Sequence, residues 1–179
     1  DKSYDVINNF SQKYLSSRKL TFFTTGTVAR TYPELVARIA SDGHEVGCHY
    51  NYHDLMHNQQ LKEIEGNLQE AINLIGDAAG AKPLGFRAPA FSIPRNRLEI
   101  YDLLSKYFEY DSSYILLESD CINKNFFDST PFNLKNISEF PIIPKTYFNK
   151  INIKSGGTFF RLFPSKIISS VMKKNAALG

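Results

Sequence analysis

The hydrophobic pattern of this chain changes several times between helical and extended spacing. Apolar residues recur every three or four positions over residues 4–14 and predict an opening helix that ends near residues 16–17. The next segment, LTFFTT at residues 20–25, is rich in β-branched and aromatic residues and stops at Gly26, so it predicts a buried strand. Residues 32–40 predict a helix, because proline stands in the first turn and Gly43 follows the end.

The same alternation continues through the middle of the chain. Apolar residues at helical spacing predict the longest helix over residues 61–75, with an end between Gly76 and Gly80. Short strands and one further helix are expected on either side of it: strands at residues 45–48, 84–87 and 108–111, and a helix at residues 94–104.

Strands that alternate with helices indicate a parallel sheet with helices packed outside, as in a doubly wound sheet or a (β/α) barrel. Beyond Ser112 the pattern loosens into long loops around short strands at Phe140 and residues 159–160, and a last helix is expected from Pro164 to about Lys174. The length corresponds to one domain over residues 1–179, since no repeat or linker divides it.

Composition narrows the function classes. The formal net charge of +3 comes without an arginine-rich block or basic stripe, so nucleic-acid binding is not indicated. No apolar run approaches the ~20 residues that cross a bilayer, and the N-terminus has the pattern of an amphipathic helix and not of a signal peptide, which leaves the compartment open between cytoplasm and cell envelope. Cys48 and Cys121 have no zinc-knuckle spacing and are expected to be partly buried thiols.

The histidines are concentrated in one short stretch. All four lie between residues 44 and 57, and His49 and His53 form an HxxxH pair directly after a predicted strand. If this segment turns helically, both imidazoles lie on one side and can bind a metal that also needs a third ligand. The alternative is a pair of solvated or helix-capping histidines. His57 is expected on the surface or at a helix cap, and His44 is expected to be structural.

Two other chemical groups follow predicted strands in the same way, namely Arg87 with Pro89 and Asp111 with Ser112. In parallel α/β folds the catalytic groups collect at the carboxyl ends of the strands, so these motifs are expected to converge there with His49. The ordinary alternatives are a surface arginine in a turn for Arg87 and a strand-end carboxylate that binds turn amides for Asp111.

Four segments resemble the polysaccharide deacetylase family in the family's order. They are TFFTTGTVARTYPELVARIASDGHEVGCHYNYHDL at residues 21–55, GFRAPAFSI at 85–93, YDSS at 110–113 and SGGTFFRLFP at 155–164. The last segment most resembles a bacterial subgroup associated with exopolysaccharide synthesis. The resemblance implies an incomplete (β/α) barrel and hydrolysis of N-acetyl groups on a polysaccharide.

The resemblance also assigns roles. It implies a divalent metal, usually zinc, held by an aspartate together with His49 and His53. Metal-bound water is a nucleophile near neutral pH, and the metal polarises the acetamide carbonyl. Arg87 corresponds to the arginine of the family's RxP motif, which orients the catalytic aspartate, while Pro89 sets the turn that aims it. Asp111 corresponds to the family's fourth motif and is expected to anchor or orient site residues.

Two family motifs have no counterpart in the chain. The aspartate run that ends the first strand would supply the base and one metal ligand, and a late histidine would supply the general acid. Asp1 and Asp5 precede a helix instead of following a strand, and Asp54 is a conceivable substitute ligand. The expected fold therefore lacks its first and last strands, either in a fragment of a longer deacetylase or in a degenerate relative that binds sugar without cleaving it.

The expected partner is an N-acetylated bacterial polysaccharide, of the exopolysaccharide or peptidoglycan type, and missing strands could come from an oligomer. Tyr52 and Pro89 are candidate substrate contacts beside the histidines. Phe159 could line a groove and Arg161 could meet an anionic sugar, although such aromatics more often fill a core. An unrelated metal-binding or flavodoxin-like domain is the remaining alternative.

Overall fold

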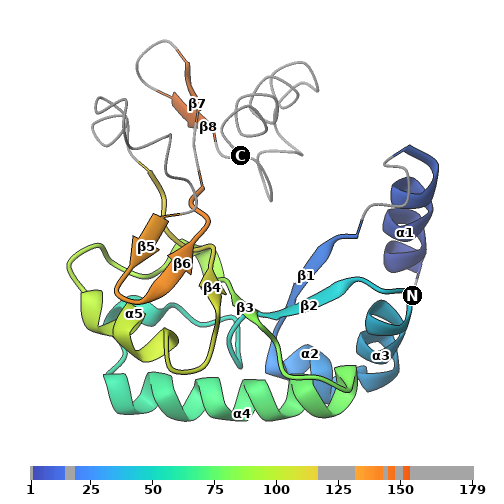
Figure 1. Cartoon of the computed structure of the whole chain (residues 1–179), viewed down its shortest axis with the longest axis horizontal. Coiled ribbons are helices and arrows are strands. Elements are labelled where there is room, and N and C mark those ends of the chain that lie inside the picture. The colour runs from blue at the N-terminus through green and yellow to red at the C-terminus, as the bar shows by residue number, and fades with distance from the viewer. Residues whose placement is uncertain (1, 15–18, 117–131, 143–144, 148–150, 154–179) are drawn as a thin grey trace. The chain divides into compact units, whose positions relative to one another are not determined.

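The computed structural model describes residues 2–14, 19–116, 132–142, 145–147 and 151–153. The chain forms two compact units, residues 1–90 and 91–179. Both belong to an α/β fold, as predicted, whereas one domain over residues 1–179 stays a prediction. Figure 1 shows the elements with the labels used below.

The first unit alternates strands and helices. Its elements in chain order are α1 (Lys2–Tyr14), β1 (Thr21–Thr24), α2 (Gly26–Thr31), α3 (Pro33–Ser41), β2 (Glu45–Cys48), the 3₁₀ turn η1 (Met56–Asn58), α4 (Leu61–Ala79) and β3 (Gly85–Phe86), and the 3₁₀ turn η2 (Pro89–Phe91) follows at the end of the unit.

Three parallel strands form the sheet of this unit. β2 pairs with β1 in the register Thr21↔Glu45 to Thr24↔Cys48, and with β3 through Cys48↔Phe86. Thr24, Cys48 and Phe86 therefore stand level, one at or near the carboxyl end of each strand. Parallel neighbours require crossover connections, which α2 with α3 and then α4 provide. The residues that follow Thr24, Cys48 and Phe86 in the chain therefore lie along one edge of the sheet.

The helices take the places that their end signals predict. Pro33 begins α3, Gly43 follows it with φ +78°, and Gly80 ends α4 in the left-handed conformation. α4 contacts α2, α3 and β2, and Figure 1 shows its length beside the shorter helices. Leu61, at the start of the apolar stripe of α4, is 38% exposed. The rest of the stripe is buried: Ile64, Leu68, Ala71, Ile72 and Ile75. This stripe is the main part of the unit's core.

Helix α1 docks through one buried tyrosine. The Tyr4 hydroxyl donates to Asp42 Oδ2 at 2.5 Å, and the Arg38 guanidinium lies 5.1 Å from the centre of the Tyr4 ring. Asp5 forms an ion pair with Arg38 at 2.8 Å. Asp5 is therefore engaged at the start of α1, as expected for an acidic residue in a first helical turn.

The second unit is a small mixed sheet with one helix. Its elements are α5 (Leu98–Leu104), β4 (Tyr110–Asp111), β5 (Phe132–Leu134), β6 (Ile137–Glu139), β7 (Lys145–Tyr147) and β8 (Ile151–Ile153). β6 pairs in parallel with β4 and antiparallel with β5, and β7 pairs antiparallel with β8. α5 contacts β6 and buries Ile100, Tyr101, Leu103 and Leu104.

Most predicted elements are confirmed, but several differ. Strands β5, β7 and β8 were not predicted, since each is only three residues long. Helix α2 was not predicted, because Gly26 reads as a terminator although it begins the helix. β1 is only half-buried, since β1 lies at the end of the strand order in the described part of the chain. The helix expected from Pro94 begins at Leu98, and the strand expected at Phe140 lies at residues 137–139.

The strand at residues 159–160 and the helix from Pro164 to Lys174 fall outside the described residues. Among the helices that the structure describes, none has the length and apolar character needed to cross a membrane.

Candidate functional site

His49 stands immediately beyond the carboxyl end of β2. Its backbone N–H donates to Thr24 O at 2.8 Å, and the Arg87 N–H donates to Cys48 O at 2.9 Å. These two bonds continue the parallel ladder one step past the level row of Thr24, Cys48 and Phe86. The sequence prediction that His49 and Arg87 meet at the strand ends is confirmed.

The His49 ring is oriented by the backbone of Arg87. Its Nδ1 lies 2.6 Å from the Arg87 carbonyl oxygen. Because a carbonyl can only accept, Nδ1 carries the proton and Nε2 is left with its lone pair. Metal-binding histidines commonly have this arrangement, in which a backbone carbonyl fixes both the tautomer and the ring orientation. The contact thus favours the His49 tautomer with a proton on Nδ1 and none on Nε2.

Burial favours the same protonation state. Desolvation lowers the pKa of His49, the hydrogen bond to the Arg87 carbonyl opposes that change, and the positive charges of His53 and Arg87 add to it. The net effect is a pKa below the ordinary value for histidine. A half-buried imidazole that stays neutral keeps its nitrogen available near neutral pH.

His53 faces His49 by a different route from the one predicted. The two ring centres are 5.1 Å apart with an interplanar angle of 68°. Residues 51–53 form bends and the segment contains no helical turn, so the condition for the i, i+4 argument is not met. Tyr50 takes φ +70° instead, which turns the chain sharply and returns His53 to His49. Positive φ in a bulky residue is costly and clusters at functional sites.

The loop that carries His49 and His53 is fixed by hydrogen bonds from the start of α2 and by a buried tyrosine. Gly26 N and Thr27 N, at the start of α2, donate to Tyr50 O and Asn51 O at 2.9 Å each. Tyr50 is completely buried, and its hydroxyl donates to Gln59. These contacts fix the backbone on which both histidines stand.

Asn51 ties the same loop to helix α4. It is completely buried, and its Nδ2 donates to Glu70 Oε2 at 2.6 Å. Glu70 also forms an ion pair with Arg30 of α2. A Cβ on Gly26 would stand 2.3 Å from Asn51 Oδ1 and 3.1 Å from the Ala71 Cα, so only glycine permits this approach.

Arg87 and Pro89 form the next part of this edge. The Arg87 guanidinium lies 4.4 Å from the centre of the Phe23 ring, a cation–π contact that restrains a long side chain. Pro89 is buried and begins η2, in which Ala90 takes φ +50° and Phe91 takes φ +56°. Two consecutive non-glycine residues in the left-handed region make this turn strained.

The remaining candidates of the first unit have ordinary surroundings. Tyr52 is 42% exposed and forms a side-chain hydrogen bond with Arg30 of α2. His44 is buried and structural, as expected, because its Nδ1 accepts from Leu20 N at 3.3 Å and its Nε2 pairs with Asn8. His57 lies exposed in η1, as expected. Phe159 and Arg161 lie outside the described residues.

Asp111 of the second unit is completely buried. Its Oδ1 accepts from Ser113 Oγ at 2.6 Å and its Oδ2 accepts from Ser113 N at 3.1 Å. These bonds match the ordinary alternative of a strand-end carboxylate that binds a turn. Its register partner on β6 is Glu139, which is also completely buried.

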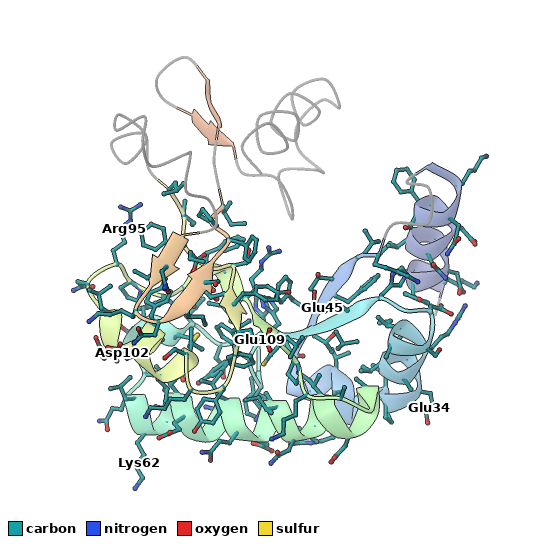
Figure 2. The ribbon with its side chains drawn as sticks, in the orientation of Figure 1. Glu34, Glu45, Lys62, Arg95, Asp102 and Glu109 are labelled. Carbon is teal, nitrogen blue, oxygen red and sulfur yellow. The ribbon has the colours of Figure 1, made fainter. Side chains whose placement is uncertain are left out.

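Glu139 was missed by the sequence reasoning. A signal was available, since the alternation in Ile137-Ser138-Glu139 places Glu139 on the same face as an apolar residue that is buried. Charged labelled residues such as Arg95 and Asp102 lie on the surface of this unit, as Figure 2 shows.

The residues at the β2 end fit a divalent cation in part. His49 offers Nε2, and the His53 ring faces it at a separation that two ligands of one ion can adopt. Within the described ranges, no cluster of three or more His, Cys, Asp or Glu side chains suited to a metal is present. Asp54 therefore does not complete a three-ligand cluster with the pair.

Curated relatives match about half of the chain. A Helicobacter pylori peptidoglycan deacetylase is 33% identical over 93 residues, which are 52% of this chain and 31% of that protein. A Bacillus cereus peptidoglycan-N-acetylglucosamine deacetylase is 33% identical over 90 residues, 50% of this chain and 32% of that protein. The matched region thus spans about a third of the length of these relatives.

Solved structures share the fold. A Mycobacterium smegmatis protein assigned to the polysaccharide deacetylases superposes with a TM-score of 0.57 at 20% identity, covering 87% of this chain and 55% of the other. The PuuE allantoinase superposes with a TM-score of 0.54 at 15% identity, covering 98% and 60%. These neighbours bear out the α/β architecture of an incomplete barrel.

The sequence model of the polysaccharide deacetylase family matches residues 10–106. That range includes β1, β2 and β3 together with the His49, His53 and Arg87 edge. More than half of the chain therefore matches one family, in the segment that holds the site. The chain belongs to the polysaccharide deacetylase family.

Proposed function

We propose that this chain is part of a metal-dependent hydrolase that removes N-acetyl groups from a bacterial polysaccharide, with His49 and His53 as ligands of a divalent cation. The observation that carries the proposal is the 2.6 Å contact from His49 Nδ1 to the Arg87 carbonyl, which leaves Nε2 as an acceptor beside the His53 ring. Zinc is the proposed metal, since imidazole nitrogen suits it.

The chain's own residues supply orientation and charge. A divalent cation at this place would activate water and polarise the acetyl carbonyl. His49 stays neutral because it is half-buried, and its ring is kept in place by the Arg87 backbone. The Arg87 guanidinium, braced on Phe23, provides a fixed positive fork that can hold a carboxylate in a bidentate contact. Asp111 is proposed as an orienting carboxylate of the same reaction.

The proposed substrate is a polysaccharide that binds next to His49 and His53. The exposed Tyr52 ring next to His53 is suited to pack on a sugar ring, and the buried Pro89 fixes the turn after Arg87. Relatives named for peptidoglycan favour an N-acetylglucosamine polymer, whereas the SGGTFFRLFP segment favours an exopolysaccharide with contacts from Phe159 and Arg161. Both polymers carry the acetamide that the proposed reaction hydrolyses.

Metal binding by the full 179-residue chain tests the ligand assignment. Titration with Zn²⁺, followed by calorimetry, should show one site in the wild type. His49→Ala or His53→Ala should each weaken binding by more than the ~10–100-fold that loss of an outer-shell partner costs. His57→Ala is the matched control and should leave binding unchanged, because His57 lies in η1 outside the facing pair. Equal binding by all three variants would contradict the assignment.

Acetate release tests the reaction itself. The Zn²⁺-loaded protein, expressed from the complete gene and incubated with N-acetylglucosamine oligomers or with an acetylated exopolysaccharide, should release acetate, and the faster of the two substrates identifies the polymer class. Metal and sugar binding without acetate release would instead support the non-catalytic carbohydrate-binding alternative for this chain.

A further inference from the structure

We propose that Glu139 is a protonated positioning residue, which donates a hydrogen bond to the Asp111 carboxylate so that the two groups share one proton and one negative charge. The proposed function assigns no role to Glu139, and the first test of this role requires no activity.

The sheet places the two side chains next to each other. β4 and β6 are parallel, with Tyr110 opposite Ser138 and Asp111 opposite Glu139. Residues in register on neighbouring strands point to the same face, so the two carboxyl groups share one side of the sheet. Each side chain is within hydrogen-bonding reach of the other.

Burial rules out two negative charges at this place. Asp111 and Glu139 both have no solvent exposure, and two adjacent carboxylates in such surroundings cannot both ionise. As an ionised oxygen, Glu139 Oε2 is buried without a hydrogen-bond partner, although Oε1 accepts from Tyr114 N at 3.1 Å. A proton on Oε2 removes this defect, because the oxygen then becomes a donor toward Asp111.

The donors around the pair decide which carboxyl keeps the proton. Asp111 accepts from both the hydroxyl and the backbone N–H of Ser113, and these bonds favour its ionised form. Burial raises the pKa of both groups, but the bonds at Asp111 oppose the rise. For Glu139, burial together with the negative charge of Asp111 raises the pKa from 4.5 to about 10.

The other titratable groups that face the pair do not supply a competing charge. Tyr101 of α5 is completely buried beside both carboxyls, and its burial and their charges raise its pKa, so it stays neutral. Tyr114 lies on the segment after β4, and Arg95 lies 4.7 Å from the centre of its ring while donating to Ile115 O at 2.5 Å. Arg95 is solvent-exposed, so it does not compensate a second buried negative charge.

The protonation state can be read directly by carbon-13 NMR of the full chain. The Glu139 carboxyl carbon should keep the chemical shift of a neutral acid from pH 5 to pH 8, and this signal should be absent from Glu139→Gln. A Glu139 signal that titrates near its ordinary pKa, or an Asp111 that stays neutral in place of Glu139, would overturn the proposal.

Stability as a function of pH gives a second readout. A group with a raised pKa in the folded state contributes its stability below the unfolded value of 4.5 and loses that contribution as pH rises toward about 10. The unfolding constant of the wild type should therefore rise between pH 5 and pH 9 relative to that of Glu139→Gln, by at most about tenfold per pH unit.

The choice of variant separates positioning from packing. Glu139→Gln keeps a neutral donor of the same shape and should fold, whereas Glu139→Ala should be destabilised at every pH because Asp111 loses its donor. Parallel pH curves for the wild type and Glu139→Gln would contradict the proposal, whatever the outcome of the metal and acetate tests.

Discussion

The β2 end and the β4–β6 pair differ in how their ionisable groups are buried and hydrogen-bonded. Both place ionisable groups at the carboxyl end of parallel strands, where an α/β fold collects its chemistry. At the β2 end, His49 is half-buried and uses one ring nitrogen for a backbone carbonyl, which leaves the other nitrogen for a ligand. In the β4–β6 pair, Asp111 and Glu139 are completely buried, and their carboxyl oxygens hydrogen-bond with each other and with neighbouring turns.

In the proposed function, this difference separates groups that touch a ligand from groups that act through their neighbours. A functional nitrogen must keep one unsatisfied position, so its supporting contacts lie on the far side of the ring. A buried carboxylate has no such position and can only orient what it contacts.

The largest stability effect is expected from removing the buried carboxylate. Asp111→Ala leaves Ser113 and Glu139 without their acceptor in a closed interior, which should lower the free energy of unfolding by about 3 kcal/mol. Asp102→Ala is the control on the same unit. Asp102, labelled in Figure 2, pairs with Lys135 at 3.7 Å on the surface, and its loss should cost less than about 1 kcal/mol. Urea denaturation measures both, and equal losses would contradict the buried role.

A smaller effect is expected at the support of the histidine loop. Gly26→Ala forces a Cβ against Asn51 and Ala71, which should cost about 2 kcal/mol and displace the loop that carries His49. Gly66→Ala provides the contrast. Gly66 lies on the exposed face of α4, where an added Cβ meets nothing within 4 Å, so the substitution should stabilise the protein by about 0.5–1 kcal/mol. Thermal unfolding should therefore shift in opposite directions, and a shift in the same direction would count against the close approach at Gly26.

The smallest effect is expected at the N-cap of α2. Thr25 Oγ1 accepts from Val28 N at 3.2 Å, and the N-terminus of this short helix binds the backbone of the histidine loop. Thr25→Ala should lower the free energy of unfolding by about 1 kcal/mol, whereas Thr25→Ser keeps the acceptor and most of the stability. If serine and alanine behave alike in urea denaturation, the hydroxyl does not cap the helix.

Strong periodic signals made the fold of the first unit predictable. The apolar stripe of α4 and the end signals at Pro33, Gly43 and Gly80 are local, so they predict elements without tertiary information. Helix α2 was not predicted, because Gly26 is required by a tertiary contact, the close approach of Asn51. Nothing in the residues near Gly26 reveals that contact.

The candidate site was predictable in its residues but not in its geometry. The predicted strand ends correctly placed His49 next to Arg87. The segment from His49 to His53 forms no helical turn, because Tyr50 adopts a positive φ that its residue type does not favour. Glu139 was missed because it is distant from Asp111 in sequence, and only the pairing of β4 with β6 brings them together.

The central claim is that His49 and His53 bind one cation through imidazole nitrogens at the β2 end. Nitrogen-15 NMR of the histidine rings during Zn²⁺ titration of the full chain tests it most directly. The signals of His49 Nε2 and of one ring nitrogen of His53 should shift together at one equivalent of metal, while the signals of His44 and His57 stay unchanged. Shifts at His57 instead, or a larger metal-induced shift at His49 Nδ1 than at Nε2, would contradict it.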